Sequence, residues 1–255
     1  MTGNEVLVEV DDGVMVITMN RPEAKNAANK ALAVGVSAAI DQLEEDPEIR
    51  VGIITGAGGT FCSGMDLKAF VSGETPVIEG RGFAGLCEYT ASKPLIAAVE
   101  GYALAGGFEM AISCDFIVSA QDAQFGIPEV KRGLVAGAGG LAKLPKQIPS
   151  RIAKEMALTG DFISAQRAFD LGLINRVADS GEALFVAREL ANKIAANGPL
   201  AVAASKQVVD KAQDWTSEEM HQEQIKILMP VFSSKDAIEG ATAFAEKRKP
   251  IWKGQ

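Results

Sequence analysis

The sequence predicts an α/β fold that continues into a mainly helical C-terminal region. Short apolar runs bounded by turn residues have the length and composition of buried strands. Glycine-rich turns follow two of these runs, at residues 56–59 and 106–107, and helical patterns follow the turns. Residues 196–255 carry no strand signal. The recurrence of strand, turn and helix favours a sheet whose loops gather at one end of the strands.

The clearest local signals lie in the first half of the chain. Two β-branched runs, 6–10 and 14–19, flank Asp11-Asp12-Gly13 and predict a hairpin. A helix over 28–43 follows, and Asp46-Pro47 predicts its end. Further elements are expected in this order: strands at 50–55 and 94–100, a helix after Gly106-Gly107, and a strand at 116–118.

From Gly139 onward the pattern is mainly helical, with one short strand expected at 174–177. Gly198-Pro199 separates two helical stretches. The run 233–236 predicts the start of the last helix, and Pro250 predicts its end. We therefore expect a core over residues 1–195 and a helical region over 196–255.

The charge balance disfavours one broad class of partner. The chain has 255 residues, of which 25 are Lys or Arg and 33 are Asp or Glu, so its formal net charge is −8. An acidic protein of this kind is not expected to bind nucleic acid, and an anionic small ligand would need a local group of basic residues. With 47% hydrophobic residues, the composition is typical of a compact globular protein.

Cysteine and histidine usage predicts neither a metal site nor a disulfide framework. Cys62, Cys87 and Cys114 are widely spaced and form no CxxC pair, which favours reduced thiols in a cytoplasm. His221 is the only histidine, and we expect it on a solvated helix face. The turn at 56–59 lacks the third glycine of a dinucleotide fingerprint. Neither a signal-peptide pattern nor an apolar run of membrane-spanning length is present, so a membrane protein is not expected.

Two glutamates are the most informative candidates for chemistry. Glu109 opens the apolar stretch 110–114, where an unpaired carboxylate would be costly, and Glu129 follows Pro128. Two carboxylates that converge on a partly dry pocket can hold a water, with one taking a proton and the other giving one. Taken alone, each is better interpreted as an ordinary residue of a first helical turn. The interpretation as chemistry therefore depends on the combination.

Two glycine turns add possible hydrogen-bond donors. Gly64 lets the backbone turn sharply, which would direct the amide of Met65 into a pocket, and Gly106 would let a substrate carbonyl approach the main chain. Exposed amides at two such turns stabilise a developing negative oxygen. Singly, either turn is better interpreted as an ordinary helix start. The run 244–249 ends in basic residues. These cations either interact favourably with the dipole of a helix C-terminus or contact a phosphate, with Phe244 beside it.

With these residues in hand, the chain resembles the enoyl-CoA hydratase/isomerase family, also called the crotonase family, over nearly its full length. The resemblance depends on many motifs in the correct order, not on any one of them. The motifs are Asn20-Arg21-Pro22 with Asn26-Ala27, the stretches 53–68 and 93–103, Gly106-Gly107-Phe108-Glu109, Cys114-Asp115, the stretches 125–129, 137–140 and 158–160, and Phe244-Ala245-Glu246-Lys247-Arg248.

The resemblance implies a fold and an assembly. The fold would be the crotonase spiral of ββα repeats, followed by a helical region used for trimer formation. A homotrimer, or a dimer of trimers, would be the assembled form. The partner would be an acyl-CoA thioester, with no cofactor beyond the coenzyme A that is part of the substrate, and no metal.

The resemblance also implies roles for individual residues. Glu109 and Glu129 match the two carboxylates of the hydratases, and Met65 and Gly106 match the two oxyanion amides. Glu109 would act as the base towards water and Glu129 as the acid towards the α-carbon. The residues implied in substrate or CoA binding are Lys25, Ala27, Ser63, Asp66, Leu67 and Lys68, with Phe244 and Lys247 reaching the CoA of a neighbouring subunit.

The implied reaction is hydration of a trans-2-enoyl-CoA to a 3-hydroxyacyl-CoA. Some features, such as the stretch 82–86 and the ending 237–254, also resemble carnitinyl-CoA dehydratases, whose reaction is the reverse type. Lys143 lies in Leu141-Ala142-Lys143-Leu144, where many members have Thr-Gln-Arg-Leu. Double-bond isomerisation and non-catalytic acyl-CoA binding remain alternatives, although the presence of both glutamates disfavours them.

Overall fold

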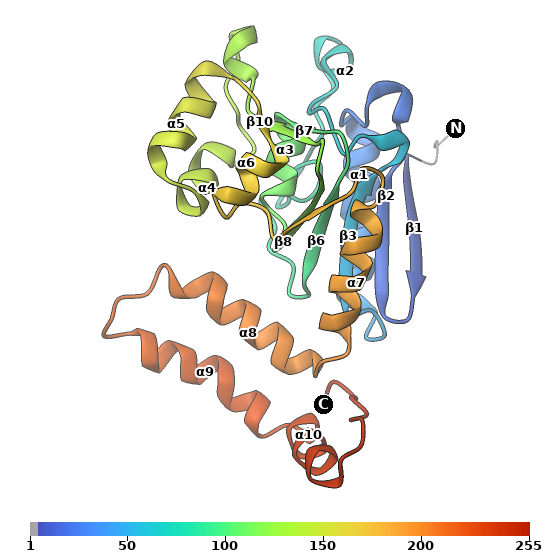
Figure 1. Cartoon of the computed structure of the whole chain (residues 1–255), viewed down its shortest axis with the longest axis vertical. Coiled ribbons are helices and arrows are strands. Elements are labelled where there is room, and N and C mark those ends of the chain that lie inside the picture. The colour runs from blue at the N-terminus through green and yellow to red at the C-terminus, as the bar shows by residue number, and fades with distance from the viewer. Residues whose placement is uncertain (1–4) are drawn as a thin grey trace.

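The computed structural model describes residues 5–255, so the first four residues of the predicted core lie outside the described part (Figure 1). A six-stranded sheet forms its centre, in the order β1-β2-β3-β6-β8-β11. Only the β1–β2 pair is antiparallel, and the remaining neighbours run parallel. The strands are β1 (Val6–Asp11), β2 (Val14–Met19), β3 (Val51–Gly56), β6 (Leu95–Val99), β8 (Phe116–Ala120) and β11 (Arg176–Ala178).

A second, smaller sheet lies beside the first. It has the order β10-β9-β7 and comprises β7 (Tyr102–Leu104), β9 (Gln124–Gly126) and β10 (Ile163–Ser164). The chain passes from a strand of the large sheet to a strand of the small sheet twice, as β6–β7 and as β8–β9. Helix α3 (Gly106–Ala111) follows the first passage and completes a ββα unit. These passages place the loops after β7 and β9 close together, since β7 and β9 pair in parallel.

Apolar side chains cover both faces of the large sheet. Along β2, Met15 and Ile17 pack into one cluster, whereas Val14 and Val16 pack into another. This alternation is the period of two of a strand, and coverage of both faces is typical of a parallel sheet. The second cluster is closed by alanines spaced four apart on α7 (Ala183–Ala195): Ala187, Ala191 and Ala195.

Ten helices and three short 3₁₀ turns connect and cover the strands in the described residues. The helices not yet bounded are α1 (Lys30–Glu45), α2 (Leu67–Val71), α4 (Gly140–Gln147), α5 (Ser150–Thr159), α6 (Ala165–Asp170), α8 (Pro199–Ala212), α9 (Met220–Phe232) and α10 (Lys235–Glu246). The 3₁₀ turns are η1 (Pro22–Ala24), η2 (Ala57–Gly59) and η3 (Glu129–Arg132). A further hairpin pairs two short strands of two residues each, β4 (Val77–Ile78) and β5 (Gly82–Phe83).

Helices α8, α9 and α10 extend away from the sheets as a helical arm (Figure 1). The end of the chain is fastened to this arm. The carboxylate of Asp236 accepts the N–H groups of Lys253 and Gly254, both at 2.8 Å, and Trp252 Nε1 donates to the carbonyl of Ala196 at 2.9 Å. None of the helices within residues 5–255 is long and apolar enough to span a membrane.

The structure confirms the predicted α/β core and the helical ending, and it corrects two details. The last helix ends at Glu246, before Pro250, because Lys247 adopts a left-handed φ of 56°. The N–H of Arg248 then bonds the carbonyl of Ala243 at 3.0 Å, which closes the helix as a Schellman-type end. The small sheet was not predicted, because strands of two or three residues are too short to show a period.

Candidate active site

Glu109 is a buried carboxylate in the first turn of α3. Only 2% of the residue is exposed. Its Oε1 accepts the N–H groups of Ala138 and Gly140, each at 2.8 Å, from the start of α4. Burial raises the pKa of Glu109, while the two N–H donors and the ammonium of Lys143 oppose that rise. Its Oε2 accepts no hydrogen bond from the described part of the chain, so one oxygen is held and the other is available.

Glu129 begins η3 and lies close enough to Glu109 for the two charges to interact. Burial raises the pKa of Glu129 to about 7, and the negative charge of Glu109 adds to the rise. Its Oε2 is buried and has no hydrogen-bond partner among residues 5–255. An unpartnered buried carboxylate oxygen is costly. The structure therefore places the two predicted glutamates within range of each other's charge and leaves them in different environments.

The two predicted amides lie on adjacent turns. Gly64 has a φ of 106°, and a Cβ added there would lie 3.5 Å from the nitrogen of Gly106. Ala28 pairs with Met65 by donating to Gly64 and accepting from Asp66, so the N–H of Met65 points away from Ala28. Neither Met65 nor Gly106 donates its N–H to another residue in the described part of the chain. Both amides thus remain free for an acceptor atom.

Close packing explains why glycine starts α3. A Cβ at Gly106 would overlap the ring of Phe83, and one at Gly107 would overlap the carbonyl of Cys62. Phe83 comes from β5, and Cys62 pairs with Ala103 of β7. The turn that carries the Gly106 amide is therefore fixed from two sides.

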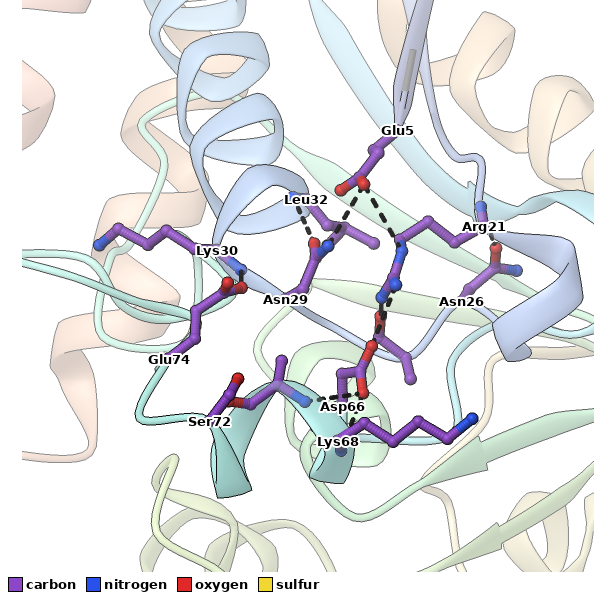
Figure 2. Close-up of polar contacts among 12 residues, drawn as sticks. Glu5, Arg21, Asn26, Asn29, Lys30, Leu32, Asp66, Lys68, Ser72 and Glu74 are labelled. Atoms are coloured by element: carbon purple, nitrogen blue, oxygen red, sulfur yellow. Dashed lines mark hydrogen bonds and ion pairs between the residues drawn. The ribbon is translucent and has the colours of Figure 1, made fainter. Parts of the chain in front are cut away.

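Arg21 holds together the segments that contain Ala27 and Asp66 (Figure 2). Its guanidinium donates to the carbonyl of Ala27 and, at 3.0 Å, to Asp66 Oδ2. The other oxygen of Asp66 accepts the N–H groups of Lys68 and Ala69 and so caps α2. Since Asp66 directly follows Met65, this contact also fixes the chain beside the Met65 amide.

The remaining residues predicted to bind substrate or CoA fall into two groups. One group lies on the paired segments 25–28 and 63–68, which are joined by the hydrogen bond from Ser63 N–H to the Lys25 carbonyl at 3.1 Å. Lys25 and Lys68 are exposed there, and Lys25 Nζ lies 5.4 Å from the ring centre of Tyr102. Leu67, at the start of α2, is 42% exposed. These residues form one surface beside the free amides.

The second group, Phe244 and Lys247, lies elsewhere. Phe244 is 87% exposed on α10, and Lys247 follows at the end of that helix. Figure 1 shows α10 at the opposite end of the molecule from α2. Within one chain these two residues therefore do not join the surface formed by Lys25 and Lys68. His221 is exposed on α9, as predicted.

A groove of about 1100 Å³ runs between α8 and the core. Lys143 and Ser113 belong to its wall, whereas Glu109 and Glu129 do not. Lys206 crosses it by pairing with Asp115, and it also contacts Asp210 at 3.0 Å. In residues 5–255 no group of three or more His, Cys, Asp or Glu residues is arranged to hold a metal ion.

Sequence reasoning missed the residues that hold Glu109. The donors are main-chain groups of Ala138 and Gly140, and Lys143 and Ser113 lie behind them. The glycine-rich run 137–140 before a predicted helix was a usable signal, because an N-terminal helical turn offers free N–H groups.

Gly140→Ala is expected to lower the melting temperature by several degrees. A Cβ at this position would lie 2.8 Å from Glu109 Cγ and 3.0 Å from its Oε1, so the buried carboxylate would have to leave its two donors. Weakening hydrogen bonds to a charged group typically costs about 1.5–3 kcal/mol. Gly137→Ala is the matched control, because the nearest atom to its Cβ would be the Val135 carbonyl oxygen at 3.9 Å. Equal melting temperatures for the two variants would contradict this packing.

Comparison with known proteins gives consistent matches. A family model described as "Enoyl-CoA hydratase/isomerase" matches residues 9–255. A carnitinyl-CoA dehydratase from Salmonella enteritidis PT4 is 44% identical over 250 residues, covering 95% of each chain. The structure of an enoyl-CoA hydratase from Mycobacterium tuberculosis H37Rv matches with a TM-score of 0.97 and 58% identity, covering 99% of this chain and 100% of that one.

A carnitinyl-CoA hydratase structure from Mycobacterium avium is also similar, with a TM-score of 0.78 and 41% identity over 99% of this chain and 100% of that chain. The structural matches extend over the sheets and the helical arm together. They confirm the fold that the resemblance implied, an α/β spiral core with a helical C-terminal region.

Proposed function

Because this chain belongs to the enoyl-CoA hydratase/isomerase family, a family whose hydratases and dehydratases are hydro-lyases, we propose that it adds water reversibly across the double bond of a trans-2-enoyl-CoA. The product is a 3-hydroxyacyl-CoA. The single observation that carries the proposal is the pair of interacting glutamates in unequal environments: Glu109 is buried, whereas Glu129 is half-buried and only its Oε2 is buried without a partner among residues 5–255.

The thioester oxygen is proposed to sit between the N–H groups of Met65 and Gly106. Negative charge develops on this oxygen when water attacks the β-carbon, and donors aimed at it lower the barrier. Losing one donor of this kind typically costs about 3 kcal/mol. The adjacency of the two turns and the absence of a competing acceptor for either N–H within residues 5–255 support this placement.

The division of roles between the glutamates follows from their surroundings. Burial raises the pKa of Glu109, but two N–H donors and a nearby ammonium oppose that rise, so we assign Glu109 as the base that takes a proton from water. Glu129 has a pKa raised to about 7, so we assign its protonated form as the acid that protonates the α-carbon. The two titrate as an interacting pair, and measured values belong to the pair.

The coenzyme A moiety is proposed to lie along the exposed surface that contains Lys25 and Lys68, with Ala27, Ser63, Asp66 and Leu67 beside it. The lysines supply the local positive charge that an acidic protein needs for an anionic ligand. Phe244 and Lys247 are proposed to reach the CoA of a neighbouring subunit, in a homotrimer or a dimer of trimers assembled through the helical arm. The reaction needs no further cofactor, and we propose a cytoplasmic enzyme.

Carnitinyl-CoA dehydration is the second candidate. The 44% identity to the Salmonella dehydratase and the similarity to the Mycobacterium avium structure favour it. Removal of water from a 3-hydroxyacyl thioester uses the same two carboxylates in reverse. Isomerisation and mere acyl-CoA binding are less well supported, because neither requires both carboxylates as an interacting pair.

One assay separates these activities. Purified protein is mixed with crotonyl-CoA, with longer enoyl-CoAs and with a carnitinyl-type thioester, and the ultraviolet band of the conjugated thioester is followed. We expect the band to disappear with enoyl-CoAs, and we expect mass spectrometry to show a product that has gained one water. A product of unchanged mass would indicate an isomerase. Binding of the thioesters without turnover of any of them would contradict the proposal.

A further inference from the structure

Lys143 is a half-buried ammonium whose hydrogen-bond partners are neutral. Its Nζ donates to the carbonyl oxygen of Cys87 at 2.6 Å and to Ser113 Oγ at 2.8 Å. It forms no ion pair with any carboxylate in the part of the chain that the structure describes. A charge removed from water without a counter-ion costs free energy. This arrangement therefore points to a use for the charge itself.

The contacts of Lys143 lie directly behind Glu109. Ser113 Oγ donates to the main-chain carbonyl of Glu109 at 2.7 Å, so Lys143, Ser113 and Glu109 form one chain of hydrogen bonds. The Lys143 stem runs back along the first turn of α4, because a Cβ at Gly139 would lie 3.5 Å from Lys143 Cε. That turn carries the Gly140 N–H bonded to the Glu109 carboxylate.

Helices α3 and α4 are thus joined at two points one turn apart. At the first point, main-chain N–H groups of the α4 start bind the Glu109 side chain. At the second, Lys143 binds Ser113, four residues after Glu109, and also the Cys87 carbonyl. Both contacts tie the start of α4 to the segment that contains Glu109.

Among the described residues, three titratable groups interact electrostatically with Glu109. Lys143 comes from α4, Glu129 from η3, and the thiol of Cys87 from the segment after β5. Burial raises the pKa of Cys87 to about 12, so this thiol stays neutral at the pH of an assay. Of these three groups, Lys143 carries the positive charge and Glu129 is the second carboxylate.

We propose that Lys143 is a positioning residue for the hydration reaction, which holds α4 against α3 and keeps the Glu109 carboxylate ionised and directed at the attacking water. The proposal rests on the function proposed above. It goes further by assigning a role to a residue outside the proposed set of substrate-binding and catalytic residues. A purely structural clamp would need only a hydrogen-bond donor, whereas this role needs the positive charge.

The test compares four variants by the pH dependence of kcat/KM. Lys143→Met and Lys143→Gln remove the charge, and the glutamine keeps a donor for Ser113. Lys143→Arg keeps the charge. Lys146→Met, on the same helix, removes an exposed charge that pairs with the exposed Asp214 at 3.6 Å.

We expect the acidic limb of the profile to move up by about one pH unit in Lys143→Met and Lys143→Gln. The sign follows because Glu109 acts in its ionised form, and loss of a nearby cation makes that form harder to reach. A decrease of about tenfold or more in kcat is also expected, since small displacements of a catalytic group are costly. Lys143→Arg and Lys146→Met should keep the limb of the parent protein.

A second readout does not depend on turnover. Carbon-13 NMR titration of labelled glutamate carboxyls gives the pKa of Glu109 directly, with the signal assigned by its loss in Glu109→Gln. A higher Glu109 pKa in Lys143→Gln than in the parent protein supports the role. If Lys143→Met does not fold by circular dichroism, Lys143→Gln decides. An unchanged Glu109 pKa in Lys143→Gln would overturn the inference, whereas lack of parental turnover would count only against the proposed reaction.

Discussion

Glu109→Gln is expected to lower kcat by about 10²- to 10⁴-fold, the range typical for loss of a general acid or base. The amide oxygen of glutamine can still accept the N–H groups of Ala138 and Gly140, which are now 2.8 Å from Oε1. The fold and the affinity for the CoA thioester should therefore be kept. What is lost is the ability to take a proton from water. Stopped-flow or steady-state kinetics of crotonyl-CoA hydration measure the change in kcat.

Glu100→Gln provides a matched control for this experiment. Glu100 also holds main-chain N–H groups with its carboxylate, those of Gly181 at 3.0 Å and Ala183 at 2.8 Å, but at the start of α7. The same chemical change there should leave kcat within a few-fold of the parent. If Glu109→Gln retained parental turnover, or if both variants lost it equally, Glu109 would not be the base.

Glu129→Gln is expected to lower kcat by a similar factor and to change the shape of the pH profile. Glu129 must be protonated to act as the acid, and burial with the Glu109 charge raises its pKa to about 7. Hydration in the parent protein should therefore weaken as the pH rises through about 7, because the proton is then lost. In Glu129→Gln the residual activity should no longer show this alkaline limb.

The corresponding measurement is kcat/KM over a series of pH values on both sides of neutrality. Glu155→Gln, an exposed glutamate on α5, should keep the parental profile. An alkaline limb that persisted unchanged in Glu129→Gln would assign the titration to another group. A limb on the acidic side only would contradict the assignment of Glu129 as the acid.

Much of the fold was predictable because its long elements have strong periods. The hairpin before α1, the buried strands β3, β6 and β8, and the helix that starts at Gly106 all lie where the sequence predicts them. Strands β7, β9 and β10 were not predictable from local pattern. They contain three, three and two residues, and they exist because the large sheet and the loops around it hold them in place.

For the candidate site, the sequence predicted the residues proposed to act on the substrate but not the residues that support them. The identities of Glu109, Glu129, Met65 and Gly106 came from motifs. The structure places the turns at Met65 and Gly106 side by side, and it places Glu129 within range of the Glu109 charge. Their roles stay a prediction. Lys143 and Ser113 could not be assigned from the sequence, because their partners are main-chain carbonyls and a hydroxyl rather than residues with a recognisable spacing.

The way in which Glu109 is held has an evolutionary consequence. Its two donors belong to the peptide backbone, which every residue other than proline supplies. Exchange of the Ala138 side chain would keep its N–H donor only where the new side chain fits the core, because Ala138 is 5% exposed. At Gly140 even a methyl group is excluded, because it would overlap the side chain of Glu109. Elsewhere in this loop, exchanges between small side chains should therefore keep the donors that hold Glu109, whereas larger side chains should displace them.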